Sequence, residues 1–554
     1  MASKEHVCHN YVFLKPEEAS FIELIRLLFS SDIEKRSFIN CSGDEGRERR
    51  KFERRWVIFV SIVVQWMFLF FRTPMARTGG TVNKLLNLVA TNGGLFALFK
   101  MWLTGKVAEA DSLSTRSVLG NLDRRVELDD NIKPGNTRYE GALSMMAAKM
   151  SYENQVLIKT IVTGHWKMKF IEFYNFWNGY QRRDSTQAFL FQDKTSDPNL
   201  IVVAFRGTDP FDADAWRTDF DISWCEFAGL GKTHSGFMKA LGMQPNRSWP
   251  LEQEAQQVNA AEQHPHQFAY YKIRQILMDL MQENKNAKFI LTGHSLGGAL
   301  AVLFAAVLAM HDYEEKYAWL MGRLEGVYTF GQPRVGDENF GGFMREKLKN
   351  YGVKYMRYVY SNDMVPRIPY DDKTLLFKHF GPSLYFSSCY KGKVLEEEPN
   401  KNYFNVYWFI PKCLNALWEL IRSFILPLIR GAEYNESWFM RMLRVVGLVI
   451  PGLAAHAPQD YVNITRLGSL PSLAHVQKRI PLIVMELGRD AKLLSRGGVE
   501  SVQKGFGGGT QQDYFNVFWF IPKCLNALWE LIRSFILPLK RGLRNTRKAD
   551  YEDA

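Results

Sequence analysis

Several features that would assign this 554-residue sequence to other classes of protein are missing from it. The six cysteines form no CxxC pair and no metal-binding spacing, so we expect no metal site and no cofactor. No nucleic-acid recognition motif accompanies the net charge of +12, so we expect no nucleic-acid partner. The first residues lack the apolar core and cleavage site of a signal peptide, which leads us to expect free thiols on the cytosolic side.

The positive charge is concentrated partly in two clusters, each next to an apolar run. They are RERRKFERR at residues 47–55 and RGLRNTRK at residues 541–548. Aromatic residues make up 14% of the chain, and many lie in continuous runs, which favours contact with lipid as well as core packing. This combination suits the surface of an anionic membrane or a lipid droplet. The alternative is an ordinary charged surface in water.

Two apolar runs follow the first basic cluster. Residues 56–71 (WVIFVSIVVQWMFLFF) contain no charged residue, but a helix of this length measures about 24 Å against a hydrocarbon core of about 30 Å. Residues 85–103 form the second run, which an Asn-Gly-Gly sequence at 92–94 interrupts. We predict a membrane-embedded hairpin or a pair of helices in a lipid monolayer. The alternatives are a buried core helix and a bilayer span with Arg72 extended to the interface.

Changes in composition predict five regions along the chain. We expect an N-terminal segment at 1–48, an apolar region that anchors the chain to a membrane or droplet at 49–105, and a polar linker at 106–138. Residues 139–488 are predicted to form one large α/β domain, and residues 489–554 to form a tail.

A near-exact repeat lies in the C-terminal part of the chain. Residues 403–431 return as 514–542 with two differences, which indicates a recent duplication or a misassembled gene rather than a solenoid. In the first copy, the polar residues fall within about 100° of a helical wheel, and apolar residues cover the rest. These polar residues are Lys412, Asn415, Glu419, Arg422 and Ser423. We predict an interfacial helix that ends at Pro427, with a helix packed on the protein core as the alternative.

The pattern that indicates chemistry is the G-x-S-x-G of residues 293–297, Gly-His-Ser-Leu-Gly. The short apolar run before it predicts a buried strand, and the small apolar residues 299–310 after it predict a helix. In this context the pattern forms a nucleophile elbow, where the glycines make room for a sharp turn and Ser295 stands exposed at the sheet edge. A serine in this place indicates ester or amide chemistry. The alternative is a glycine-rich helix start with an idle serine.

Further strands are predicted on both sides of the elbow. Apolar or aromatic segments occur at 187–193, 200–205, 326–330 and 355–360, with a charged helix at 337–348. Strands that alternate with helices in this order predict a doubly wound, mostly parallel α/β sheet with helices on both faces.

A serine nucleophile needs a histidine base and an acid that orients the histidine. Asp363 lies in the loop that follows the predicted strand 355–360, where such an acid is expected, and Asp371 and Asp372 are rivals in a polar turn.

For the base, three histidines follow Asp363 in the sequence: His379, His456 and His475. His456 lies in a loop before residues 461–467, which we predict to be extended. The aromatic surroundings of His379 favour a hydrogen-bonded core histidine. Position alone does not decide between these candidates.

The negative oxygen of the reaction intermediate needs hydrogen-bond donors, each worth about 3 to 4 kcal/mol. One is expected to be the amide of Leu296, directly after the nucleophile. The amide and hydroxyl of Thr208, in the Gly-Thr turn after strand 200–205, are the second candidates. Residues 209–227 then alternate acids with aromatic residues, and we predict a lid that opens when these aromatics meet oil. The lid aromatics are Phe211, Trp216, Phe220 and Trp224.

Six motifs in sequence order resemble the class 3 lipases. They are FRGT, HSGF, GHSLGGALA, TFGQPRVGD, SNDMVPRIP and AHAPQDYVNITRLG, and the match runs from about 139 to 468. The long apolar N-terminal extension is similar to that of the plant oil-body lipases of this family. The resemblance implies an α/β-hydrolase fold, Ser295 as nucleophile, Asp363 as acid, His456 as base, the Thr208 and Leu296 donors, and no metal.

The same resemblance implies hydrolysis of triacylglycerol at the surface of a lipid droplet. We expect the chain on the cytosolic side of the droplet, with the endoplasmic reticulum membrane as a second location. Within enzymes, the alternative is a phospholipase A1 or a galactolipid acyl hydrolase, because one triad can cleave any accessible carboxylic ester. From another class, the alternative is a catalytically idle droplet-surface protein. The sequence gives no indication of the oligomeric state.

Overall fold

A computed structural model describes most of the first 469 residues of the chain. The chain divides into two compact units, Met1–Val476 and Gln477–Ala554, and every described residue belongs to the first. Three of the predictions lie outside the described residues. They concern the tail with the second copy of the repeat, and the rival candidates His475 and Asp372. The described residues are 8–29, 36–42, 52–108, 111, 115–196, 199–243, 267–369, 371, 377–403 and 408–469.

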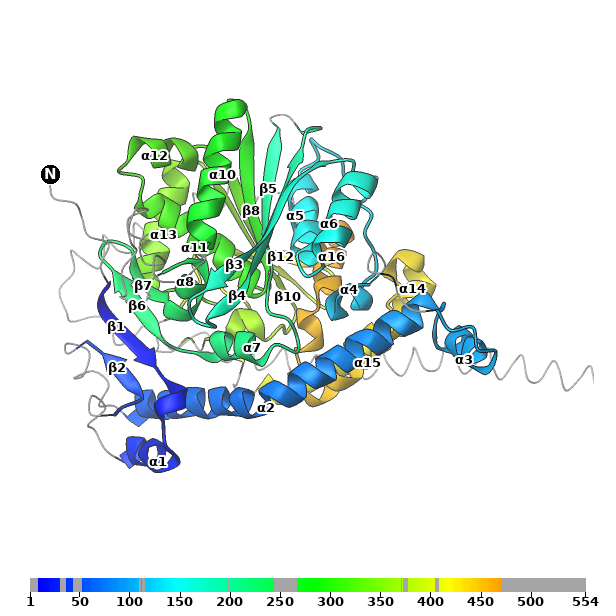
Figure 1. Ribbon diagram of the computed structural model, residues 1–554, viewed down its shortest axis with the longest axis horizontal. Coiled ribbons are helices and arrows are strands. Elements are labelled where there is room, and N and C mark those ends of the chain that lie inside the picture. The colour runs from blue at the N-terminus through cyan, green and yellow to red at the C-terminus, as the bar shows by residue number, and fades with distance from the viewer. Residues whose placement is uncertain are drawn as a thin grey trace, which may run out of the picture. The chain divides into compact units, whose positions relative to one another are not determined.

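The central sheet has eight strands in the order β12-β11-β10-β9-β8-β5-β4-β3 (Figure 1). Its middle strands, from β5 to β11, run parallel, whereas β3, β4 and β12 at the two edges are antiparallel to their neighbours. The predicted doubly wound, mostly parallel α/β sheet is confirmed. The bounds are β3 Lys169–Asn178, β4 Arg183–Asp193, β5 Leu200–Phe205, β8 Lys288–His294, β9 Leu324–Phe330, β10 Lys354–Tyr360, β11 Ser383–Phe386 and β12 Gly392–Leu395.

Helices cover both faces of this sheet, because alternate residues of each strand point to opposite sides. In β5, Ile201 and Val203 pack in one core with the apolar helix α11 (Leu296–Met310), and Val202 and Ala204 pack in the other core with α5 (Tyr139–Met150). Both cores consist of buried apolar side chains, which hold the strand ends at the edge where the loops begin. The remaining helices of the first face are α8 (Ser235–Leu241), α10 (Ala269–Glu283), α12 (Glu315–Met321) and α13 (Glu338–Asn350), and those of the second are α6 (Gln155–Thr160), the π-helical turn Ile161–His165 and α16 (Pro458–Arg466).

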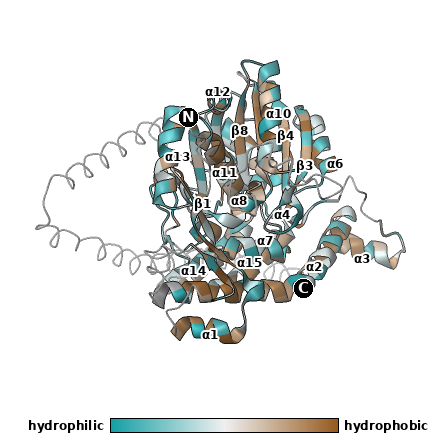
Figure 2. Ribbon diagram, turned by 60° about the vertical axis from the view of Figure 1, so that its left-hand side comes forward, coloured by the Kyte–Doolittle hydropathy of each residue, from teal (hydrophilic) through white to brown (hydrophobic). Residues whose placement is uncertain are grey.

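The N-terminal apolar region forms one long helix, α2 (Phe52–Thr91), followed by the short α3 (Leu95–Leu103). The predicted hairpin between 56–71 and 85–103 is wrong in this respect, because the helix continues through Pro74 and breaks only at the Asn-Gly-Gly sequence. Among the described residues, one helical segment, Arg55–Thr91, is long and apolar enough to cross a membrane by length and composition. Figure 2 shows apolar residues along α1 (Phe21–Phe29), α2 and α3.

The predicted linker contains a packed helix. Within residues 106–138, α4 (Val118–Leu122) buries Leu119 and Leu122. The side chain of Asn87 in α2 donates to the carbonyl oxygen of Arg116 and accepts from its amide, at 2.9 and 2.8 Å. This part of the chain therefore connects α2 to the α/β domain through direct contacts.

A second, antiparallel sheet of four strands has the order β2-β1-β6-β7. Strand β1 (Cys8–Leu14) is followed by a 3-10 turn, Pro16–Glu18, and pairs with β2 (Ile39–Cys41) and with β6 (Trp224–Phe227). Strand β6 pairs in turn with β7 (Gly231–His234). The N-terminal segment, from which the sequence predicted only a helix around 19–29, is therefore part of the α/β domain.

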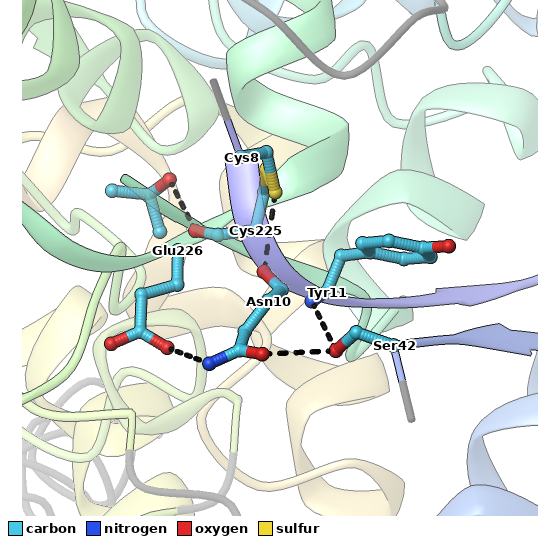
Figure 3. The surroundings of a disulfide bond; sticks show 7 residues. Cys8, Asn10, Tyr11, Ser42, Cys225 and Glu226 are labelled. Carbon is cyan, nitrogen blue, oxygen red and sulfur yellow. Dashed lines mark hydrogen bonds between the residues drawn. A yellow bond between two sulfur atoms is a disulfide. The ribbon is translucent and has the colours of Figure 1, made fainter. Parts of the chain in front are cut away.

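The pairing of β1 with β6 joins Cys8 to Cys225 in a disulfide, across 217 positions and a Cα–Cα distance of 5.9 Å (Figure 3). Beside it, Asn10 donates to Glu226 and accepts from Ser42, both at 3.1 Å. The prediction of free thiols is wrong for these two cysteines, because their proximity depends on a strand pairing that the local sequence does not disclose. Cys389 and Cys413 are free thiols, and Cys524 lies outside the described residues.

Two C-terminal helices form an antiparallel hairpin, α14 (Phe409–Arg430) and α15 (Trp438–Val449), joined by a 3-10 turn at Ala432–Tyr434. The predicted end of the first helix at Pro427 is wrong, because α14 continues to Arg430 and stops at Gly431 with φ 104°. The predicted extended segment at 461–467 is also wrong, because α16 starts with Pro458 in its first turn and continues to Arg466.

We expect Leu303→Ala to destabilise the protein by about 2–5 kcal/mol, because it leaves a cavity in the core that the surrounding side chains fill only in part. Leu303 lies on α11 and is completely buried. Chemical denaturation monitored by circular dichroism measures the change. The exposed Glu346→Ala on α13 is the control and should leave the denaturation midpoint close to that of wild type.

Candidate active site

The sharp turn between β8 and α11 places Ser295 in a strained conformation, with φ 58° and ψ −132°. A positive φ is uncommon for a residue with a side chain and costs about 1–3 kcal/mol, so surrounding structure must hold it. Glycines make the turn tight: a methyl group on Gly293 would overlap the backbone of Gly297, and one on Gly297 would overlap the carbonyl of Phe205. The predicted strand, turn and helix are therefore present, with the serine at the carboxyl end of the strand.

The three side chains that were predicted as a triad meet at this turn. His456 Nε2 lies 2.8 Å from Ser295 Oγ, and His456 Nδ1 lies 2.8 Å from Asp363 Oδ2. Because a carboxylate only accepts, Nδ1 carries the ring proton and Nε2 is free to accept the serine proton. This arrangement can activate a hydroxyl for attack on a carbonyl carbon. The catalytic roles of these residues stay a prediction.

Asp363 is completely buried at the end of β10. Its carboxylate accepts hydrogen bonds from the amide of Val365 at 2.9 Å and from the hydroxyl of Tyr461 at 2.5 Å, besides His456. The 3-10 turn Val365–Arg367 begins at this point, and Arg367 donates to the carbonyl oxygens of Ser361 and Asp363. The acid is therefore fixed from several sides.

The rival candidates lie elsewhere. His379 is buried and lies 2.7 Å from the carbonyl oxygen of Pro366, and burial lowers its pKa well below the ordinary value. Its ring also lies 3.7 Å from Glu398 Oε1, so it is a hydrogen-bonded histidine among polar partners. Asp371 forms an ion pair with Lys401 at 3.2 Å. Neither residue is brought to Ser295 by the structure.

Two further residues, His294 and Tyr461, hold the base and the acid in place, and sequence reasoning missed both of them. His294 lies next to Ser295, and its Nε2 donates to the carbonyl oxygen of His456 at 2.9 Å while its Nδ1 accepts from Tyr152 at 2.8 Å. Burial lowers the pKa of His294, so the ring remains neutral and keeps this tautomer. The rings of His294 and His456 stack at 4.5 Å. His456 ends the 3-10 turn Ala454–His456, and these contacts fix that turn.

Tyr461 was missed for a different reason. Residues 458–466 form a helix after His456, and this helix places the hydroxyl of Tyr461 next to Asp363. Burial raises the pKa of Tyr461 well above the ordinary value, so its hydroxyl remains a donor. The aromatic residue five positions after the histidine was the available signal, and the predicted extended conformation concealed it.

The two predicted oxyanion donors lie at neighbouring strand ends. Leu296 is the first residue of α11, and Thr208 follows β5. The hydroxyl of Thr208 donates to Asp219 Oδ2 at 2.8 Å, so its proton is directed to that carboxyl group. Asp219 is completely buried, and this burial raises its pKa to about 7 in spite of the hydrogen bond from Thr208. The structure thus links the turn at Thr208 to helix α7 (Ala213–Phe220), which carries Asp219.

The residues predicted as lid aromatics do not form one group. Trp216 and Phe220 on α7 stack around Phe68 of α2, with ring centroids 6.4 and 5.7 Å from it. Phe211 lies so close to Gly79 of α2 that a methyl group there would overlap its ring. Trp224 lies apart, in strand β6 of the small sheet. Opening of a lid stays a prediction.

Polar contacts also join α7 to α2. The hydroxyl of Ser61 donates to the carbonyl oxygen of Phe220 at 2.9 Å, and Arg72 pairs with Asp214 at 3.0 Å. Three of the four predicted lid aromatics, Phe211, Trp216 and Phe220, therefore contact the apolar N-terminal helix. Among the described residues, no group of three or more histidine, cysteine or acidic side chains is arranged to hold a metal ion.

Comparison with known proteins finds one matching family model, several relatives and several solved structures of similar fold. A family model described as Lipase (class 3) matches residues 202–373. Triacylglycerol lipase OBL1 of Nicotiana tabacum is 42% identical over 500 residues, which cover 78% of this chain and 87% of that protein. The protein of the same name from Arabidopsis thaliana is 40% identical over 501 residues, or 83% of this chain and 95% of that protein. Among solved structures, the Rhizomucor miehei lipase propeptide complex aligns with a TM-score of 0.32 and 21% identity, over 46% of this chain and 69% of the other.

We expect Asp219→Asn to reduce the pH dependence of stability. The carboxyl group has an ordinary pKa of 3.8 and a folded pKa of about 7, so between these values the folded chain keeps a proton that the unfolded chain has released. The stability that this proton provides is complete below about pH 4 and is lost as the pH rises to about 7. Asparagine has no such proton.

Melting temperatures of wild type and variant, measured from pH 4 to pH 8, test this expectation. The difference between them should move in favour of the variant up to about pH 7 and then level off. A difference that stays constant over the whole range contradicts a raised pKa of Asp219.

Proposed function

The chain belongs to the class 3 lipases, and from this premise we propose that it releases fatty acids from triacylglycerol, and from di- and monoacylglycerol, through Ser295, His456 and Asp363. The observation that carries the proposal is the continuous chain of contacts from Asp363 Oδ2 through the His456 ring to Ser295 Oγ, at 2.8 Å each. The relatives named triacylglycerol lipase, which this chain covers over most of their length, support the choice of substrate.

In the first half of the reaction, His456 Nε2 takes the proton of Ser295 as the serine oxygen attacks the carbonyl carbon of the ester. The amides of Leu296 and Thr208 donate to the negative oxygen that forms. The protonated His456 then gives its proton to the leaving glyceride oxygen, and the ester bond breaks. An acyl-enzyme on Ser295 remains.

In the second half, a water molecule loses a proton to His456 and attacks the acyl-enzyme. The intermediate collapses, the proton returns to Ser295, and the fatty acid leaves. Asp363 keeps the proton of the imidazole on Nδ1 and stabilises the imidazolium. Tyr461, Val365 and His294 hold the acid and the base in place, so little reorganisation is needed during the two steps.

The proposed place of reaction is the cytosolic surface of a lipid droplet, with the endoplasmic reticulum membrane as the second location. The apolar segment Arg55–Thr91 and the exposed aromatic residues of α2 and α3 support contact with lipid. Phe70, Phe96 and Trp102 are among the exposed side chains, and they would be unfavourable in water. Because α2 also contacts α7, the substrate would reach Ser295 from the lipid side.

Hydrolysis of emulsified triacylglycerol beside phosphatidylcholine vesicles tests the proposal, with the purified full-length protein and with Ser295→Ala as the control. We expect fatty acid release from triacylglycerol and a loss of about 10⁴-fold or more in the variant. Preferred hydrolysis of phosphatidylcholine would favour a phospholipase A1. Hydrolysis of neither substrate would favour a catalytically idle surface protein and contradict the proposal.

Tyr461→Phe should lower kcat about 3- to 10-fold, because it removes one hydrogen bond from the Asp363 carboxylate without opening a cavity. The charge of the carboxylate then has one hydrogen-bond donor fewer, so it interacts more strongly with the protonated form of His456. The acidic limb of the pH–rate profile should therefore move to higher pH. A soluble short-chain ester is the appropriate substrate, since it avoids effects of the lipid surface.

The matched control is Tyr351→Phe, which removes a tyrosine hydroxyl that donates to Asp312 at 3.2 Å. Tyr351 lies at the C-terminal end of α13, before β10 begins, whereas Asp363 follows the other end of that strand. The pH–rate profile of this control should coincide with that of wild type. If Tyr461→Phe changes the rate but not the pH limb, the hydroxyl does not act through the acid and the base.

A further inference from the structure

The α14–α15 hairpin has the opposite polarity from an ordinary surface helix, which turns its polar side to water and its apolar side to the core. In α14, the charged residues Lys412, Glu419 and Arg422 are buried. In α15, Arg444 is buried with an exposed fraction of 1%. The outer sides of both helices carry large apolar side chains, and Leu428 and Val449 are the most exposed, at 76% and 80%. The predicted wide apolar stripe of α14 therefore faces away from the protein.

The buried charges form one ion-pair cluster between the hairpin and α16. Arg444 binds Glu436 through two contacts of 2.6 Å, and Glu419 and Asp460 at 3.3 and 3.1 Å. Arg422 binds the same Asp460 at 3.1 Å. Taking five charged groups out of water is costly, and their mutual pairing offsets much of that cost. An exposed apolar side of this size marks a surface that meets an apolar partner.

This cluster also connects the hairpin to the loops that carry the acid and the base. Asp460 is adjacent to Tyr461, which donates to Asp363. Asn415 of α14 donates to Ser361, two positions before Asp363, at 3.0 Å. Arg422 donates to the hydroxyl of Tyr360 at 2.7 Å, at the carboxyl end of β10. The hairpin therefore lies at the edge of the sheet where the strands end and the triad is found.

We propose that the α14–α15 hairpin is a lipid-docking surface, whose outward apolar sides insert into the phospholipid monolayer of a lipid droplet while its buried ion pairs hold the triad loops at that surface. This docking is distinct from attachment through α2. It rests on the proposed function only for the identity of the lipid, since binding is measured without hydrolysis.

The charges on the outer side favour a phospholipid surface over other occupants. Neither helix exposes a carboxylate: Glu419 is the one acidic residue in α14, it is buried, and α15 has none. Arg430 and Arg441 lie beside the apolar side chains, Arg430 exposed and Arg441 half-buried. The turn between the helices exposes one carboxylate, Glu433, so the apolar surface is bordered by two cations and one anion. An apolar surface with this excess of cations matches the acyl chains and head groups of an anionic monolayer. In Figures 1 and 2, the hairpin and α2 lie along the same lower edge of the protein, so one lipid surface can contact both.

The test uses purified full-length protein and triolein droplets coated with phosphatidylcholine and phosphatidylserine. Leu428→Asp/Val449→Asp places two charges on the outer side of the hairpin, and we expect droplet binding in a flotation assay to weaken by about tenfold or more. The matched control is Val156→Asp/Asn286→Asp, two exposed positions on α6 and in the turn before β8, and it should bind like wild type. Hydrolysis of a soluble short-chain ester checks that each variant is folded.

A second pair of substitutions covers the case in which the aspartate variant does not fold. Leu428→Trp/Val449→Trp enlarges the apolar surface and should strengthen droplet binding by about threefold or more. The proposal is overturned if the aspartate pair floats like its control, or if the tryptophan pair binds no better than wild type. It is also overturned if the aspartate pair floats like wild type but dissociates a dimer in ultracentrifugation, since the surface would then join two copies. Wild-type protein that floats but hydrolyses no triacylglycerol would leave docking intact and refute the proposed function.

Discussion

The strained turn at Ser295 is the constraint on which the active site depends. The serine can hold a φ of 58° only because Gly293 and Gly297 let β8, α11 and the end of β5 approach one another without a side chain between them. The same turn places the serine oxygen against His456 and puts the first amide of α11 beside the end of β5, where Thr208 follows. A relaxed turn would lose the proposed nucleophile and the proposed oxyanion donors together, and the two apolar cores on either side of the sheet keep the turn in place.

Charge is distributed in an unusual way around this turn. The acid and base are surrounded by buried hydrogen bonds from Tyr461, His294 and Arg367, and farther out by the ion pairs of Asp460 with Arg422 and Arg444. The outer sides of α14 and α15 are apolar, and the first half of α2 exposes Trp56, Met67 and Phe70. Polar groups thus lie inside, where they fix the geometry, and apolar groups lie outside, where an oil phase would meet them. This is the arrangement that an enzyme working on an insoluble ester requires.

The sequence predicted what depends on local patterns. The strand, turn and helix around Ser295 were readable because glycine spacing and hydrophobic runs specify them within fifteen residues or so. The choice of Asp363 over Asp371 followed from its position after a strand. Features that depend on contacts between distant segments were not readable. Cys8 and Cys225 meet through a strand pairing, and Tyr461 reaches Asp363 only once residues 458–466 are helical. The α2 helix continues through Pro74 because its partner α7 offers contacts that the isolated sequence does not show.

Covalent labelling with a phosphonate analogue of a triacylglycerol tests the central claim most directly, because the reagent reacts only with a serine that a neighbouring base has activated. Intact-mass and peptide mass spectrometry of the full-length protein should show one adduct per chain, located on Ser295, and His456→Ala should slow its formation to the background rate. An adduct on another residue, or labelling of Ser295 that does not depend on His456, would contradict the account.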